Sequence, residues 1–206
     1  MILPIITAPD KRLKVKSQPV AAVDHDVRKL LDDMVETMRA APGIGLSAIQ
    51  VGVAKRIMVV EVDDAERLQS EESAVSEPAA PAKRTTRYLV NPEIVWESDK
   101  QVFCEEGCLS LPDQFAEIER PADITVRYLD RDGKAQELQA SGMLSRCIQH
   151  EMDHLDGLLL VDHLTAVRRH MILRKLEKAR KATRVPARSE EHTSELQSQS
   201  TISYAV

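Results

Sequence analysis

The segment RCIQHEMDHLDG, residues 146–157, carries side chains whose types and spacing could bind and use a metal ion. If the segment is helical, His150 and His154 lie four positions apart on one face and can direct both imidazoles at one cation. Glu151 follows the first histidine, where its carboxylate can take a proton from water without being a metal ligand. Two nitrogen ligands and one general base are typical of zinc-dependent hydrolases, so the segment predicts metal-assisted hydrolysis.

Two histidines leave this site one ligand short, because a catalytic metal usually has three protein ligands and one open position. The metzincin pattern has its third histidine where this chain has Leu160. Glu177 lies at a distance along the chain that a gluzincin could use, but the basic run around it predicts a surface position. Neither residue therefore identifies the third metal ligand.

The cysteines are better candidates for the third ligand. Cys147 is one turn before His150 on the same predicted helix, and we expect it to pack behind the site. Cys104 and Cys108 lie in VFCEEGCLSLP, residues 102–112. We favour Cys108, because the adjacent Gly107 lets the backbone approach closely and an apolar extended run follows it.

The elements that must position these residues predict an α+β fold. A helix is expected over 24–40, with apolar residues at helical spacing, and it ends before Pro42 and the glycines of GIGLSAIQVG. Segments 55–62, 87–97 and 124–133 predict strands, the last ending in an Asp-Gly turn. Segment 141–157 predicts the helix of the histidines, with Ser141 as its cap and Gly157 as its stop. Strands dominate the middle and helices the ends, which favours α+β over alternating βαβ units.

The composition excludes several classes of protein. Apolar residues make up 43% of the 206 residues, enough for a core, and the net charge of −5 argues against general nucleic-acid binding, DNA included. Three cysteines do not suggest a disulfide framework. No apolar run approaches the ~18 residues that span a bilayer. We therefore expect a soluble, cytoplasmic protein without membrane partners.

Two segments are expected to lie outside the packed fold. Residues 66–86 are polar and rich in Ala and Pro, which predicts a flexible loop between strands. Residues 188–198, RSEEHTSELQS, match the translation of a widely used sequencing-library adapter codon by codon. We expect the natural gene to end or diverge near Ala187, leaving 1–187 as one catalytic domain and 188–206 as an artefactual disordered tail.

Three segments in order resemble the signature motifs of the peptide deformylase family. They are GIGLSAIQVG (43–52), EEGCLSLP (105–112) and QHEMDHLDG (149–157), and the resemblance extends over about residues 2–165. It implies an α+β fold in which antiparallel strands pack around a central HExxH metal-binding helix, with helices near both ends of the chain. It also implies removal of the N-formyl group from the initiator methionine of nascent polypeptides, with release of formate.

The resemblance assigns a role to each matching residue. It implies that Cys108, His150 and His154 are metal ligands, and that Glu151 is the general base and acid. Further roles fall to Gln50 and the backbone N–H of Leu109, which would hold the formyl oxygen, and to Ile44, Gly45 and Gly107, which would line the substrate. The implied cofactor is one divalent ion, Fe²⁺ in preference to Zn²⁺, Ni²⁺ or Co²⁺.

The chain departs from the family pattern at the methionine pocket, where an aliphatic position is Arg146, and in the length of segment 66–86. A basic amphipathic helix is expected over 165–184, and in bacterial relatives a C-terminal helix docks on the ribosome. Two alternatives remain at this stage: a zincin-type peptidase with Glu177 as third ligand, and a catalytically silent homologue that binds ribosomes or metal.

Overall fold

The computed structural model of the chain describes residues 1–63 and 84–183. The predicted tail and most of the predicted 66–86 loop lie outside this described part. Residues 84–86 do not belong to a loop, because a strand already begins at Arg84; this boundary of the prediction was wrong. The elements follow in the order η1 (Lys11–Lys14), α1 (His25–Ala40), β1 (Gly45–Ser47), η2 (Ala48–Val51), β2 (Ile57–Asp63), β3 (Arg84–Glu97), β4 (Gln101–Cys108), β5 (Leu111–Pro121), β6 (Ile124–Leu129), β7 (Ala135–Ala140), α2 (Gly142–Leu155), η4 (Leu160–His163) and α3 (Ala166–Thr183).

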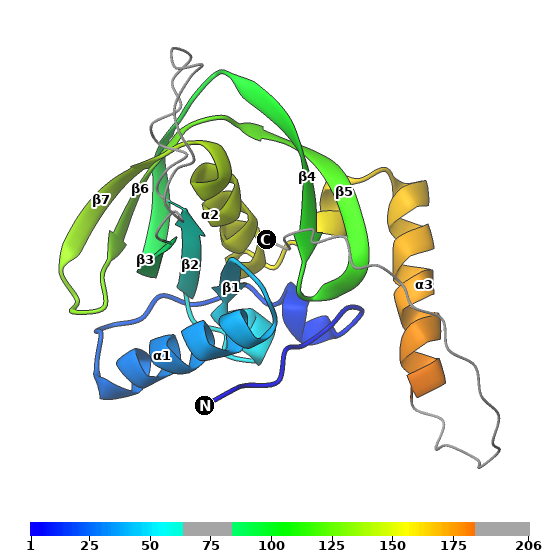
Figure 1. Cartoon of the computed structure of the whole chain (residues 1–206), viewed down its shortest axis with the longest axis horizontal. Helices are drawn as coiled ribbons and strands as arrows, with labels where there is room; N and C mark the ends of the chain where they lie inside the picture. Colours follow the sequence, from blue (N-terminus) through cyan, green and yellow to red (C-terminus); the bar gives the residue numbers. More distant parts are fainter. Residues whose placement is uncertain (64–83, 184–206) are drawn as a thin grey trace, which may run out of the picture.

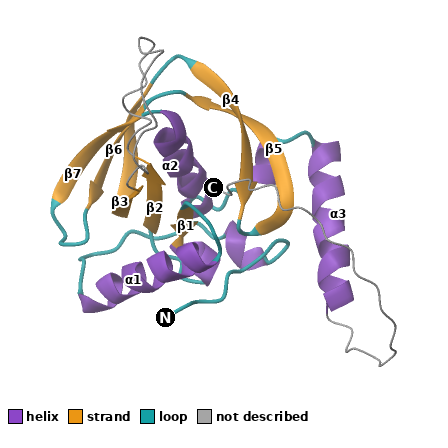
Figure 2. Cartoon of the chain, viewed as in Figure 1, coloured by secondary structure: helices purple, strands orange, loops and turns teal. Residues whose placement is uncertain are grey.

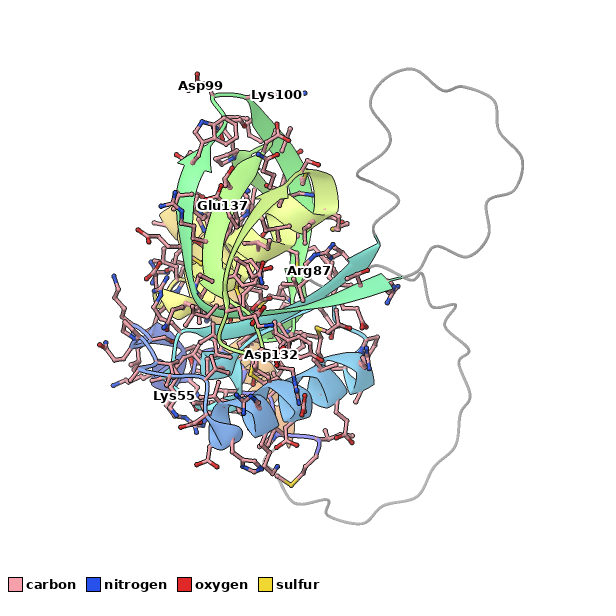
Figure 3. The ribbon with its side chains drawn as sticks, turned by 90° about the vertical axis from the view of Figure 1, so that its left-hand side faces the viewer. Lys55, Arg87, Asp99, Lys100, Asp132 and Glu137 are labelled. Carbon is pink, nitrogen blue, oxygen red and sulfur yellow. The ribbon has the colours of Figure 1, made fainter. Side chains whose placement is uncertain are left out.

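The strands form two antiparallel sheets. Five strands pair in the order β1-β2-β3-β6-β7, and β4 pairs with β5 in a separate two-stranded sheet. The turn from β3 into β4, with Asp99 and Lys100, projects at one end of the molecule (Figure 3). The mixed helices and antiparallel strands confirm the α+β prediction.

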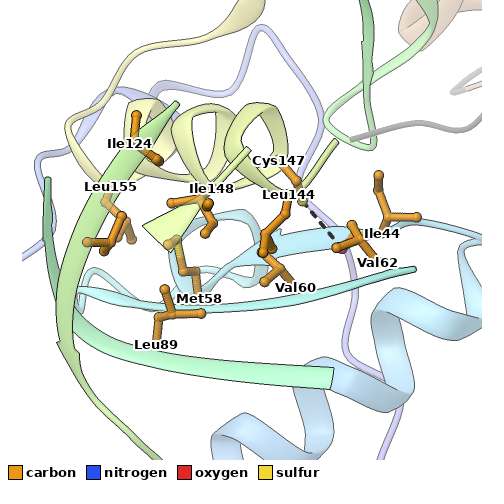
Figure 4. Packing of buried hydrophobic residues seen from close by; sticks show 12 residues of the cluster. Ile44, Met58, Val60, Val62, Leu89, Ile124, Leu144, Cys147, Ile148 and Leu155 are labelled. Atoms are coloured by element: carbon orange, nitrogen blue, oxygen red, sulfur yellow. Dashed lines mark hydrogen bonds between the residues drawn. The ribbon is translucent and has the colours of Figure 1, made fainter. Parts of the chain in front are cut away.

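Helix α2 lies between the two sheets (Figure 1). Ser141 occupies the predicted cap position before the helix, although its side chain makes no capping hydrogen bond, and Gly157 adopts φ +77° just after the helix, as predicted from its residue type. Figure 4 shows Leu144, Ile148 and Leu155 of α2 packed over Met58 and Leu89 of the five-stranded sheet. This apolar contact fixes the helix against the sheet, so the opposite face of α2 is held toward β4 and β5.

The other face of the five-stranded sheet is covered by α1 (Figure 1). Alternate residues of β2 separate the two sides: Ile57 and Val59 pack in the cluster of α1, whereas Met58 and Val60 pack in the cluster of α2. Because both faces of β2 are buried, the strand and its neighbour β1 form a rigid base for the residues that follow.

A third apolar cluster joins β4 and β5 to the C-terminal part of the described chain. Leu111 and Ile118 of β5 pack with η4 and with Leu176 of α3. Helix α3 lies on the outside of β5 and is otherwise mostly exposed (Figure 2). Among the described residues, no helix has the length and apolarity needed to cross a membrane.

Candidate metal centre

A thiol and two imidazoles converge between β4 and α2. The ligand atoms of Cys108, His150 and His154 all lie within 4.8 Å of one another, and the three side chains are buried. The Cys108 Sγ is 3.1 Å from Nε2 of His154, and the two imidazole rings lie edge to face with centroids 5.0 Å apart. The i, i+4 spacing on α2 therefore does bring both histidines to one point, with Cys108 opposite them.

A break in the strand register lies beside Cys108. Gly107 pairs with Phe115, but the next residue, Cys108, pairs with Leu111, so extra residues of β5 bulge out opposite the end of β4. Asp113 lies in this bulge with φ +57°. A bulge bends the strand that carries it, which here is β5. Cys108 lies on the same face of β4 as Glu106, and both side chains contact histidines of α2.

The donor set fits a divalent cation. His150 Nδ1 is 2.9 Å from Oε2 of Glu106, while its Nε2 is buried and has no hydrogen-bond partner among the described residues. A buried nitrogen without a partner costs free energy, and a cation bound to Nε2 would remove that cost. These three side chains also match the usual number of protein ligands at a catalytic metal site, which is three, with a fourth position left open.

The charges around Cys108 favour its thiolate form. Burial raises the pKa of Cys108, but the adjacent His154 and His150 outweigh burial and lower it to about 5. The thiolate is the form of cysteine that binds metals. The site can therefore present a deprotonated sulfur at neutral pH.

A buried ion pair supports His150 from behind. Arg120 of β5 donates from Nη2 to Oε2 of Glu106 at 2.9 Å and is 3.0 Å from Asp153, while Glu106 accepts from His150. Burial raises the pKa of Glu106, but Arg120 and His150 outweigh it and lower the pKa to about 2. Glu106 is therefore ionised, and it fixes which nitrogen of His150 carries the proton.

The general base predicted from the sequence is buried beside the three ligands. Glu151 accepts a hydrogen bond from the Ser47 hydroxyl at Oε2, 2.7 Å away, while its Oε1 has no partner among the described residues. Burial raises the pKa of Glu151. A carboxylate with a raised pKa is better matched to proton transfer near neutral pH than an exposed one.

Gln50 reaches the same site from η2. Its Oε1 accepts the backbone N–H of Ser47 at 2.8 Å, and its Nε2 lies 3.2 Å from Ser110 Oγ and 3.9 Å from Cys108 Sγ. The amide oxygen is thus occupied and the amide N–H₂ group faces the thiol. This is the orientation that an oxyanion donor needs.

The residues predicted to line the substrate lie in β1, directly before β1 and in β4. Gly45 faces Glu151 and Cys147, because a Cβ added there would lie 2.5 Å from Oε1 of the glutamate and 2.8 Å from the cysteine Sγ. Ile44 precedes it with its carbonyl bound to the backbone N–H of Glu61 at 2.7 Å. Across the site, Leu109 contacts the segment through its side chain, which a Cβ on Gly43 would meet at 2.7 Å. Gly107 precedes the thiol ligand in β4.

The remaining candidates for the third ligand lie elsewhere. Glu177 is on α3, exposed, and paired with Lys181 at 2.9 Å, so the zincin alternative loses its ligand. Cys104 is half-buried on β4 and is not part of the group. Cys147 is buried and donates to the carbonyl of Ile44 at 3.4 Å, which agrees with the expected packing role. Arg146 is half-buried on α2, one turn before His150.

Sequence reasoning did not find Glu106, Arg120 or Ser47. Glu106 could have been found, because it lies two positions before Cys108 on one strand and therefore on the same face. Arg120 and Ser47 were not marked by any pattern in the neighbouring sequence. The arginine was consistent with a surface position and the serine with a turn.

Comparison with known proteins supplies independent evidence. The family model described as polypeptide deformylase matches residues 2–170. A peptide deformylase of Rhizorhabdus wittichii is 51% identical over 178 residues, which are 86% of this chain and 95% of that protein. The peptide deformylase of Rhizobium meliloti is 46% identical over 180 residues, covering 87% of this chain and 95% of that protein.

Solved structures agree with the sequence relatives. The crystal structure of peptide deformylase from Ehrlichia chaffeensis has a TM-score of 0.77 and 40% identity, covering 89% of this chain and 99% of that one. A second structure of peptide deformylase from that organism, in complex with actinonin, has a TM-score of 0.77 and 42% identity, covering 86% and 97%. Because the family model spans most of the chain and the relatives align over nearly their whole length, this chain belongs to the peptide deformylase family.

Proposed function

We propose that Cys108, His150 and His154 hold one divalent cation, and that this centre carries out the family's reaction in this chain. The reaction is hydrolysis of the N-formyl group of nascent polypeptides, with release of formate. The observation that carries the proposal is the buried convergence of one thiol and two imidazoles beside a buried carboxylate, Glu151. Neither the peptidase nor the silent homologue is favoured by this arrangement.

The proton transfers are assigned to Glu151. A bound divalent ion would supply Lewis acidity, which lowers the pKa of water and polarises a carbonyl group. Glu151 takes a proton from the water that attacks the formyl carbon. It then gives the proton to the leaving amine, so that the C–N bond breaks and formate and a free amino terminus result.

Two hydrogen-bond donors are assigned to stabilise the negative charge that develops on the formyl oxygen. The Nε2 group of Gln50 faces the site, and the backbone N–H of Leu109 follows directly after the thiol ligand. Loss of one such donor typically reduces turnover by ~10²–10³. The two donors must hold their positions before the reaction begins. The hydrogen bond from the backbone N–H of Ser47 to Gln50 supports this, because it holds the amide side chain in place.

Ile44, Gly45 and Gly107 are proposed to contact the substrate backbone and the reacting group. The absence of a side chain at Gly45 leaves room beside Glu151, where any Cβ would touch the carboxylate. A formyl carbon bears only a hydrogen atom, whereas an acetyl group adds a methyl group. Such a narrow space is expected to admit the formyl group and to exclude the acetyl group.

We propose Fe²⁺ as the working metal, with Zn²⁺, Ni²⁺ and Co²⁺ as possible substitutes. The family resemblance supports iron, and the donor set accepts it, because imidazole and thiolate bind several first-row ions. A thiolate ligand donates charge and weakens the acidity of the metal. An ion that readily adds a further ligand is therefore expected to be more active than zinc.

We also propose that α3 contacts the ribosome. The helix is bound to the fold through a few apolar residues, Leu176 among them, and exposes basic side chains along its length. They are Arg168, Arg169, Arg174, Lys175, Lys178 and Lys181. Arg169 and Lys181 are paired with Asp162 and Glu177, so the proposal rests on the other exposed cations of the helix. Exposed cations fit RNA phosphates, and such binding weakens steeply as salt rises. Sedimentation with purified ribosomes at two salt concentrations tests the contact, and retention that does not change with salt would contradict it.

The function of the centre is tested by Glu151→Gln, which keeps the shape of the side chain but cannot accept a proton at neutral pH. We expect metal content near that of the wild type and turnover of a formylated dipeptide reduced by several orders of magnitude. If the variant keeps both metal and turnover, Glu151 has no part in the chemistry.

A further inference from the structure

We infer that Ser47 is a positioning residue for the general base, an inference that rests on the proposed function of Glu151. Ser47 lies at the end of β1, fully buried. Its Oγ is 2.7 Å from Oε2 of Glu151 and 2.9 Å from the backbone oxygen of the same residue. The hydroxyl therefore contacts both the carboxylate of Glu151 and the backbone of α2, the helix that carries this glutamate.

This contact distinguishes the two oxygens of the carboxylate. Ser47 binds Oε2, whereas Oε1 is buried, has no partner among the described residues, and faces Gly45. The last torsion of a glutamate is broad, so the two oxygens could exchange by rotation if nothing held them. With Oε2 held by the serine, Oε1 is left to accept the proton of the attacking water.

The same serine holds the second reacting side chain. Its backbone N–H donates to Oε1 of Gln50, which leaves the amide Nε2 to face the thiol. Ser47 pairs with Met58 of β2, a strand buried on both faces, so its position is set by the sheet. Groups held by rigid elements keep a reacting geometry better than groups on loops. One strand residue thus orients the base through its hydroxyl and the amide through its backbone.

The hydroxyl alone can be removed with Ser47→Ala, which leaves the backbone contact to Gln50 intact. The matched control is Ser145→Ala, which removes another fully buried hydroxyl, one that contacts Gln149 on the same helix as Glu151. Metal-loaded wild type, both serine variants and Glu151→Gln are compared on one formylated dipeptide. The measurements are kcat, KM, melting temperature and metal per chain.

We expect Ser47→Ala to lower kcat about tenfold, as for loss of a hydrogen bond to a charged group, with KM within about twofold of the wild type and full metal content. Ser145→Ala should keep the wild-type kcat. A kcat of Ser47→Ala within about twofold of the wild type, while Glu151→Gln is inactive, would overturn this inference and leave the proposed function standing. A loss of metal in proportion to kcat would also overturn it, because the serine would then support the ligands. Activity in Glu151→Gln would instead refute the proposed function.

Discussion

Replacing Gly45 by alanine should reduce turnover, by displacing Glu151, more strongly than it reduces the stability of the fold. The added Cβ would lie 2.5 Å from Oε1 of Glu151, about 0.9 Å short of the 3.4 Å at which ordinary contact begins. The carboxylate cannot rotate away freely, because Ser47 holds its other oxygen. A displacement of about 1 Å at a reacting group can cost about 10²-fold in rate, so we expect kcat to fall by about that factor.

The same substitution should destabilise the chain moderately. Inserting a methyl group into a packed site typically costs about 1–3 kcal/mol. For a domain of this size about 2 kcal/mol lowers the melting temperature by about 4–8 °C. Adding Cys147→Ala removes the second contact, 2.8 Å from the new Cβ, and should return part of the stability but none of the lost kcat.

The assay is formate release together with a thermal melt, with Gly43→Ala as the control. At Gly43 the added Cβ would meet Cδ1 of Leu109 at 2.7 Å, the end of a side chain that can turn away, so its melting temperature should change less. Wild-type kcat in Gly45→Ala would refute the reasoning, and so would recovery of kcat when Cys147 is also changed.

Three further predictions concern the ion pair, the metal and the end of the chain. Arg120→Met leaves Glu106 buried without its cation and should cost about 3–5 kcal/mol in chemical denaturation, with partial recovery when Glu106→Gln is added. An unchanged unfolding midpoint would contradict the buried pair. Protein loaded with Fe²⁺ without oxygen should turn over faster than the zinc form and lose activity in peroxide through oxidation of the metal and Cys108, whereas equal activity and no peroxide sensitivity would contradict iron. Deleting 188–206 should leave melting temperature and turnover unchanged, and a chain that unfolds would show that 1–187 is not the complete domain.

The sequence predicted best what depends on local spacing. The i, i+4 histidines and their neighbouring apolar residues placed α2 almost to its ends, because one face packs on the sheet and the other bears the ligands. Cys108 was favoured from its glycine neighbour, but its convergence with His154 joins residues 46 positions apart, which no local pattern reveals.

The contacts that support the site were missed for a physical reason. Glu106 and Arg120 are 14 positions apart, and Ser47 and Glu151 are 104 apart, so their pairing exists only in the folded chain. β5 carries Arg120 on its inward face beside Ile118, which breaks the apolar alternation by which a half-buried strand is recognised. A buried cation paired with two carboxylates contains the same residue types as a cluster of charges on the surface. The two differ only in burial, which the sequence does not show.

The most direct test of the central claim is release of formate by the metal-loaded protein. Formyl-Met-Ala and acetyl-Met-Ala are incubated separately with it, and formate or acetate is measured together with free amine. The account predicts one formate for each new amine from the first peptide and no reaction with the second. Cleavage of the bond between methionine and alanine, or equal hydrolysis of both acyl groups, would contradict it.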